Sequence, residues 1–186
     1  MIFNQHSAIT GRHAFLSPSN YHWINYTDQK LAARFVAAMA ARRGTDLHAF
    51  AHEAIRLGIK LPRATRTLNL YVNDAIGFKM VTEQPLYYSD NCFGHVDSIA
   101  FRRNTLRIHD LKTGISSTKE TQLEVYAALF CLEYQIDPFE IEIILRIYQS
   151  DEVREYIPDP ADILYIMNKI VDFDNQVEQF KKEDLW

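Results

Sequence analysis

The sequence predicts a mixed α/β domain, and three observations carry this prediction. Short segments rich in β-branched and aromatic residues, separated by polar turns, occupy the middle of the chain, as is typical of β-strands. Segments with helical periodicity precede and follow them. Glycine and proline are sparse, with six of each, so those that occur indicate where elements begin and end.

Helices are predicted for the N-terminal part of the chain. Ser17-Pro18-Ser19 combines a capping hydroxyl with a proline suited to a first helical turn, so a helix is expected to begin there. Gly44 is expected to end the alanine-rich helix that follows, and Thr45 or Asp46 to cap the next one. These helical segments cover residues 29–42, 47–57 and 64–78.

Strands and two more helices are predicted for the rest of the chain. The strands are expected over residues 83–88, 92–101, 105–111 and 139–148. A helix over residues 118–134 separates the third strand from the fourth, and Asp159-Pro160 opens a final helix that ends near residue 180. The predicted order is therefore helices, three strands, a helix, a strand and a helix.

Length and composition narrow the class of protein. A chain of 186 residues can bury one good core but is short for two full-sized domains, so a single domain over residues 1–186 is expected. Cys92 and Cys131 lack the spacing of a zinc or iron–sulfur site and are expected to be reduced thiols. The chain has no apolar run of spanning length and no signal-peptide pattern, so we expect an intracellular protein without membrane contact.

The net charge of −4 conceals an uneven distribution of charge along the chain. Residues 1–118 hold 14 Lys and Arg against 8 Asp and Glu, and all seven histidines. The remaining residues hold 6 against 16. A basic face that contacts a phosphodiester backbone is therefore compatible with the acidic total, with an acidic C-terminal part turned to solvent.

Two strands around the turn at 102–105 bring charged residues together. If Arg103 and Asn104 form the turn, paired residues have numbers that sum to 207, and Asp97 lies opposite Asp110. Alternation then places both carboxylates and Lys112 on one face. The same face carries the apolar residues Ile99, Phe101, Leu106 and Ile108. A loop one residue longer or shorter would send Asp110 to the opposite face from Asp97.

Two neighbouring carboxylates repel each other unless a cation lies between them, and hard divalent ions such as Mg²⁺ and Mn²⁺ prefer oxygen ligands. The pattern of Asp97, Asp110 and Lys112 therefore indicates a metal site. The alternative from spacing alone is that the two aspartates are strand-end charges in water, with Lys112 as their surface partner.

Four motifs follow one another along the chain: Gly44-Thr45-Asp46-Leu47-His48, Gly94-His95-Val96-Asp97, Asp110-Leu111-Lys112-Thr113-Gly114 and Gln122-Leu123-Glu124-Val125-Tyr126. In this order they resemble the motifs of RecB-like nucleases of the PD-(D/E)XK superfamily, which includes phage exonucleases and CRISPR-associated relatives. Ser17-Pro18-Ser19 is similar to the N-terminal helix of that family. The resemblance covers about residues 15–150.

The resemblance implies a restriction-endonuclease-like core, in which a central mixed β-sheet is flanked by helices. The helical N-terminal part would span residues 17–78, the catalytic core 79–150 and the C-terminal helix 159–180. The cofactor would be Mg²⁺ or Mn²⁺, as a pair of ions, without an iron–sulfur cluster.

Site residues are implied by the same resemblance. Asp97 and Asp110 would bind metal, with His48 as a third ligand and the Leu111 carbonyl as a fourth. Lys112 would orient or deprotonate the attacking water. On the next helix, Gln122 and Tyr126 lie four residues apart and share a face, so they can support the metal site or contact DNA. The alternative for this pair is a surface glutamine and a tyrosine at the edge of the core.

Two further residues near His48 stay open from the sequence. Relatives offer a glutamate near the histidine, and here His52 and Glu53 follow. On a helix His52 lies near the His48 face, whereas Glu53 lies about 140° away. His48 and His52 are also compatible with a zinc-binding pair.

The expected function is metal-dependent hydrolysis of DNA, with an exonuclease favoured over an endonuclease, in phage or prokaryotic recombination, replication or defence. DNA is the expected partner, beside a protein partner or a second copy of the chain. Candidate phosphate contacts are Arg42, Arg43, Arg63, Arg66, Arg102, Arg103 and Arg107. The alternatives are a nuclease-fold interaction module that engages a protein through its acidic C-terminal part, and a hydrolase of a small phosphorylated substrate.

Overall fold

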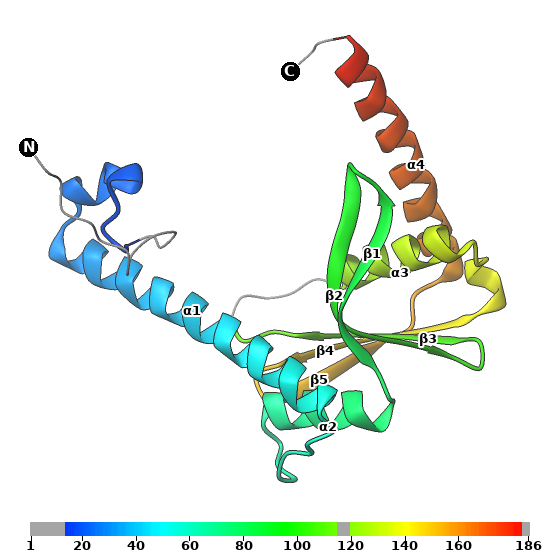
Figure 1. The fold of residues 1–186 in the computed structure, drawn as a ribbon, viewed down its shortest axis with the longest axis horizontal. Coiled ribbons are helices and arrows are strands. Elements are labelled where there is room, and N and C mark those ends of the chain that lie inside the picture. The colour runs from blue at the N-terminus through cyan, green and yellow to red at the C-terminus, as the bar shows by residue number, and fades with distance from the viewer. Residues whose placement is uncertain (1–13, 115–119, 184–186) are drawn as a thin grey trace, which may run out of the picture. The chain divides into compact units, whose positions relative to one another are not determined.

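A computed structural model describes residues 14–114 and 120–183 of the chain (Figure 1). Contacts divide the chain into two compact units, Met1–Thr45 and Asp46–Trp186. The first unit holds a 3₁₀ helix and the N-terminal part of the longest helix. The second holds the remaining elements and every residue of the candidate site below. The single domain expected from length stays a prediction.

The helices and strands are η2 (Pro18–Asn25), α1 (Asp28–Arg56), α2 (Thr67–Gly77), β1 (Val81–Ser89), β2 (Cys92–Arg102), β3 (Thr105–Leu111), α3 (Thr121–Tyr134), η3 (Pro138–Glu140), β4 (Glu142–Gln149), β5 (Glu152–Tyr156) and α4 (Pro160–Lys182). The start of α3 predicted at residue 118 lies outside the described residues.

The predicted N-terminal caps and breaks are right at Ser17 and wrong at Gly44. Ser17 caps η2, because its Oγ accepts the N–H of Ser19 at 3.3 Å, although the helix is of the 3₁₀ type. Helix α1 is 29 residues long and runs through Gly44 without a break. A glycine inside a helix costs only about 1 kcal/mol, which the surrounding alanines offset. Thr45 caps nothing, since its hydroxyl donates to the Ala41 carbonyl inside the same helix.

Five strands in the order β1-β2-β3-β4-β5 form one mixed sheet. Strands β3 and β4 are parallel, with α3 in the connection between them, and every other neighbouring pair is antiparallel. The structure thus confirms the α/β class, with a mixed sheet flanked by helices and a long N-terminal helix.

The end of the sheet differs from the prediction. Residues 139–141 are not strand, because Asp137 accepts the N–H of Phe139 and caps the short turn η3. Strand β5 was not predicted. All five of its residues are exposed and three are charged, so it lacks the alternation that marks a half-buried strand. It is the outer strand, held by its pairing with β4.

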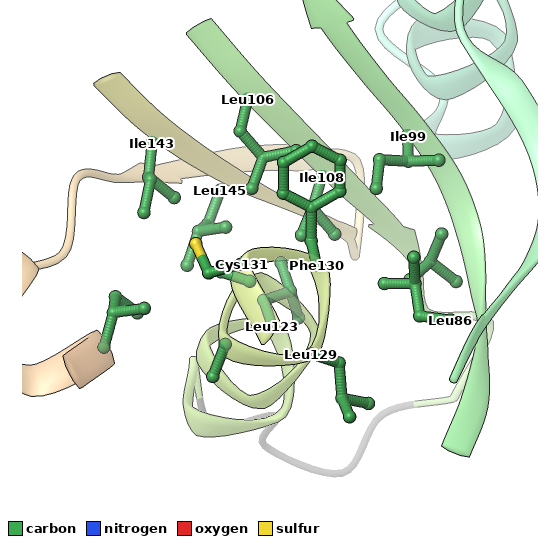
Figure 2. Close-up of a cluster of buried hydrophobic side chains, with 14 of the residues drawn as sticks. Leu86, Ile99, Leu106, Ile108, Leu123, Leu129, Phe130, Cys131, Ile143 and Leu145 are labelled. Carbon is green, nitrogen blue, oxygen red and sulfur yellow. The ribbon is translucent and has the colours of Figure 1, made fainter. Parts of the chain in front are cut away.

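Helices cover both faces of the sheet. On one face, Leu123 and Phe130 of α3 lie in one cluster with Ile99 and Ile108 (Figure 2). Ile163 of α4 belongs to the same cluster. On the other face, a second cluster joins α2 and the C-terminal end of α1 to Leu111 and Tyr148; its helical members are Ala51, Ala54, Ile55, Tyr71, Val72 and Ala75. The two clusters therefore pack against the middle of β2 and β3 from both faces, and this packing positions the ends of the two strands.

Within residues 14–114 and 120–183, no helix combines the length and apolarity needed to cross a membrane.

Candidate metal centre

The hairpin of β2 and β3 has the predicted register. Its pairs run from Arg102 with Thr105 to Ser98 with His109, and the numbers of each pair sum to 207. Arg103 and Asn104 form the turn with φ values of 52° and 57°, as a tight two-residue hairpin requires. Asp97 lies one step beyond the last pair, and its Oδ2 accepts the N–H of Leu111 at 2.8 Å.

Three side chains from three elements meet at this end of the hairpin. His48 of α1, Glu83 of β1 and Asp97 of β2 each present a ligand atom, and the three atoms lie within 4.8 Å of one another. His48 Nδ1 is 3.6 Å from Asp97 Oδ2. This cluster can bind a metal ion.

Glu83 is the member of the cluster that was not predicted from the sequence. A two-residue turn at Asp90-Asn91, with Ser89 paired to Cys92, would place Gln84 opposite Asp97 if the pairing continued regularly. A register shift between Tyr87 and Ser89 moves the pairing by one residue. Glu83 then occupies the position opposite Asp97, between Thr82, which pairs with Ser98, and Gln84, which pairs with Val96.

Asp110 and Lys112 form an ion pair beside the cluster. Lys112 Nζ lies 3.1 Å from Asp110 Oδ1 and 3.1 Å from Gln122 Oε1, so β3 and α3 together position the ammonium group. The other carboxylate oxygen of Asp110, Oδ2, is buried and accepts no hydrogen bond from the residues that the structure describes. The structure therefore brings Gln122 to Lys112, and one oxygen of Asp110 has no donor among the described residues.

The two aspartates share an unfavourable environment for negative charge. Burial, followed by the negative charge of Asp110, raises the pKa of Asp97 to about 6, against the opposing effects of the Leu111 N–H, His48 and Lys112. Burial also raises the pKa of Asp110, although Lys112 opposes the shift. A divalent cation would relieve the repulsion between these carboxylates.

The remaining predicted residues have other contacts. Tyr126 packs on Gly94, where an added Cβ would lie 3.0 Å from the tyrosine Cε1. His52 Nδ1 hydrogen-bonds the Thr82 hydroxyl, and the carboxylate of Glu53 is held by Arg56 at 2.6 and 2.9 Å. Neither His52 nor Glu53 belongs to the cluster. Binding of metal by the Leu111 carbonyl stays a prediction.

The donor set fits a divalent cation. Two carboxylates and an imidazole are ligands that several metal ions accept. Asp110 Oδ2, which is buried and has no donor among the described residues, is an acceptor of the kind that a cation or its bound water satisfies. His48 and Asp97 of the predicted set thus belong to the cluster, which adds Glu83 and does not include Asp110.

The sequence matches no protein-family model, and no curated protein matches it. Among solved structures, the chain is similar to one titled "Crystal structure of SSO0001", with 14% sequence identity and a TM-score of 0.32. The match covers 57% of this chain and 56% of that one, so it spans little more than half of either protein.

Proposed function

We propose that the protein is a metal-dependent nuclease that hydrolyses DNA phosphodiester bonds. One observation carries the proposal: Lys112 is held by Asp110 and Gln122 next to a His48, Glu83 and Asp97 cluster suited to a metal ion. A lysine beside acidic metal ligands is the arrangement that the motif resemblance to PD-(D/E)XK nucleases implies.

His48, Glu83 and Asp97 would hold the metal ion, with Asp110 as a further ligand through its unpartnered oxygen. When bound, such an ion lowers the pKa of a bound water and stabilises charge on a phosphate. Lys112 supplies a second positive charge, which offsets charge that builds up on the phosphate oxygens during attack. Gln122 restricts the lysine to this position, because its amide oxygen accepts from Nζ.

We further propose that the enzyme is an exonuclease in phage or prokaryotic DNA recombination, replication or defence. The motif resemblance supports this role, because the superfamily that it indicates includes phage exonucleases. DNA is the proposed partner.

The test is cleavage of end-labelled linear DNA and of closed circular DNA by the full chain, with Mn²⁺ or with EDTA. We expect Mn²⁺-dependent loss of linear DNA only. Lys112→Ala should lower the rate on the order of 100-fold or more, as loss of a charge-stabilising donor does in other enzymes. Lys60→Ala removes an exposed lysine from the loop before α2 and should cut like the wild type.

Two results would count against the proposal. If the wild type with Mn²⁺ left linear and circular DNA, single strands and RNA intact, the nuclease assignment would be wrong. Cleavage of circular DNA would retain the nuclease and reject the exonuclease.

A further inference from the structure

The end of β2 remote from the metal centre has an open edge. Strand β1 begins with Val81, which pairs with Ile99, so Ala100, Phe101 and Arg102 of β2 have only β3 as a ladder partner. Two hollows meet across this edge and share Lys79, Ala100 and Arg102 in their walls.

The first hollow, of about 380 Å³, is basic. Its charged lining residues are Lys79, Arg102, Arg103 and Arg107, and no Asp or Glu lines it. None of these four makes an ion pair among residues 14–114 and 120–183. The carboxylate of Glu142 lies near this hollow, and its Oε2 accepts a hydrogen bond from the hydroxyl of the lining residue Thr105 at 3.0 Å. Four unneutralised cations around one hollow favour an anion with several charges.

The second hollow, of about 560 Å³, is apolar and aromatic. Phe101, Phe130 and Tyr134 form a row in its wall, with ring centroids 5.2 and 4.8 Å apart. Tyr134 is 51% exposed and Phe101 39%, so the row offers ring surface to a ligand. No Asp or Glu lines this hollow either.

We propose that the two hollows form one nucleotide-binding site, with the base against the aromatic row and the phosphates in the basic hollow. Bases stack on aromatic side chains, and arginines and lysines bind phosphate oxygens, so one nucleotide satisfies both walls. The volumes lie within the range of small-molecule pockets. The nucleotide is either free or one unit of a nucleic-acid strand, since both offer the same two groups.

The proposed site shares no lining residue with the metal cluster, although Gln84 of the second hollow is next to Glu83 in the chain, and it goes beyond the proposed nuclease activity. Arg102 and Asp97 are five residues apart on β2, which corresponds to about 17 Å along a strand. Measurements in EDTA therefore test the nucleotide site alone, because phosphate binding through a metal at His48, Glu83 and Asp97 is prevented.

The experiment is isothermal titration calorimetry of the full chain in EDTA with ADP, inorganic pyrophosphate and the phosphorylated tetranucleotide pTpTpTpT. The variants are Arg102→Ala with Arg103→Ala for the basic wall, and Tyr134→Ala for the aromatic wall. Lys60→Ala with Arg34→Ala, and Tyr165→Ala, remove the same kinds of side chain from exposed positions outside both hollows. Because Tyr134→Ala should retain pyrophosphate binding, that ligand also reports whether the variant folds.

We expect ADP to bind at least tenfold more tightly than pyrophosphate. The double arginine variant should weaken both ligands tenfold or more, Tyr134→Ala should weaken ADP alone, and both controls should bind like the wild type. Binding of pTpTpTpT without binding of ADP supports the site with a nucleic-acid strand as its source. Equal binding of ADP and pyrophosphate, or ADP binding unchanged in Tyr134→Ala, would overturn the nucleotide assignment, as would no binding of any of the three ligands.

Discussion

Glu83 has a backbone conformation that few glutamates adopt. Its φ of 52° lies in the left-handed region, which costs a residue with a Cβ on the order of 1 kcal/mol or more. The side chain nevertheless joins His48 and Asp97 within 4.8 Å. Strained residues cluster at functional sites, so the conformation itself supports a role for Glu83 in binding.

Replacing Glu83 with Gln should weaken Mn²⁺ binding by about tenfold or more, because the variant loses one anionic ligand. Calorimetric titration with Mn²⁺ measures the change. Glu152→Gln removes an exposed carboxylate of β5 and is the matched control. Equal affinity for Mn²⁺ in the two variants would show that Glu83 does not bind the metal.

The raised pKa of Asp97 predicts how the stability of the metal-free protein depends on pH. Its pKa is raised to about 6 in the folded state, so folding favours the protonated carboxyl. The resulting contribution to stability is fully present below the pKa of the unfolded chain and is lost as pH rises through about 6.

In EDTA, the free energy of unfolding of the wild type should therefore fall relative to that of Asp97→Asn between pH 4.5 and 7.5, by on the order of 1–2 kcal/mol. Urea denaturation of both proteins at several pH values measures this difference. Parallel pH profiles for the two proteins would show that burial does not disfavour the Asp97 carboxylate.

Helix α2 is tied to the sheet by a polar network under its C-terminal end. The Tyr148 hydroxyl donates to Asp74 Oδ2 at 2.7 Å and lies 3.2 Å from His109 Nδ1. Arg146 pairs with the same Asp74 oxygen at 3.0 Å. Burial lowers the pKa of His109 to about 3, with Arg146 and Arg107 adding to the shift, so the imidazole is neutral.

Tyr148→Phe should destabilise the protein by about 1–3 kcal/mol, because Nδ1 of the buried His109 loses its hydrogen-bond partner. The other ring nitrogen, Nε2, already has no partner among the described residues, so the imidazole would have none at all. Urea denaturation gives the value. Tyr165→Phe removes an exposed hydroxyl from α4 and should change stability little. An equal effect of the two substitutions would mean that the network does not hold α2 in place.

The β2–β3 hairpin and the β1–β2 hairpin differ in how well the sequence predicts which residues pair. Arg103-Asn104 makes a regular turn, so counting from it gives the correct pairs from Arg102 with Thr105 to Ser98 with His109. Counting from Asp90-Asn91 fails, because the bulge next to Ser89 shifts the register. A bulge depends on what the strand packs against, and turn residues do not reveal it.

Across the second unit, the candidate metal site joins His48 of α1 to Glu83 and Asp97 of the β1–β2 hairpin, a separate part of the sequence. A ligand that binds only the folded chain stabilises it by about 2.7 kcal/mol at 100 times its dissociation constant. Mn²⁺ at that concentration should therefore raise the melting temperature of the wild type, as measured by circular dichroism.

His48→Ala should abolish this stabilisation, and Lys60→Ala should retain it. A rise of the same size in the His48 variant would place the bound metal elsewhere in the chain.

The sequence by itself determined the α/β class and the register of the β2–β3 hairpin, because strand alternation and a two-residue turn are local. Tertiary structure decided the rest. Helix α1 runs through Gly44 because flanking residues outweigh one glycine, and exposed β5 forms because β4 offers it a free edge. Glu83 reaches the site through a bulge that only the packed sheet defines.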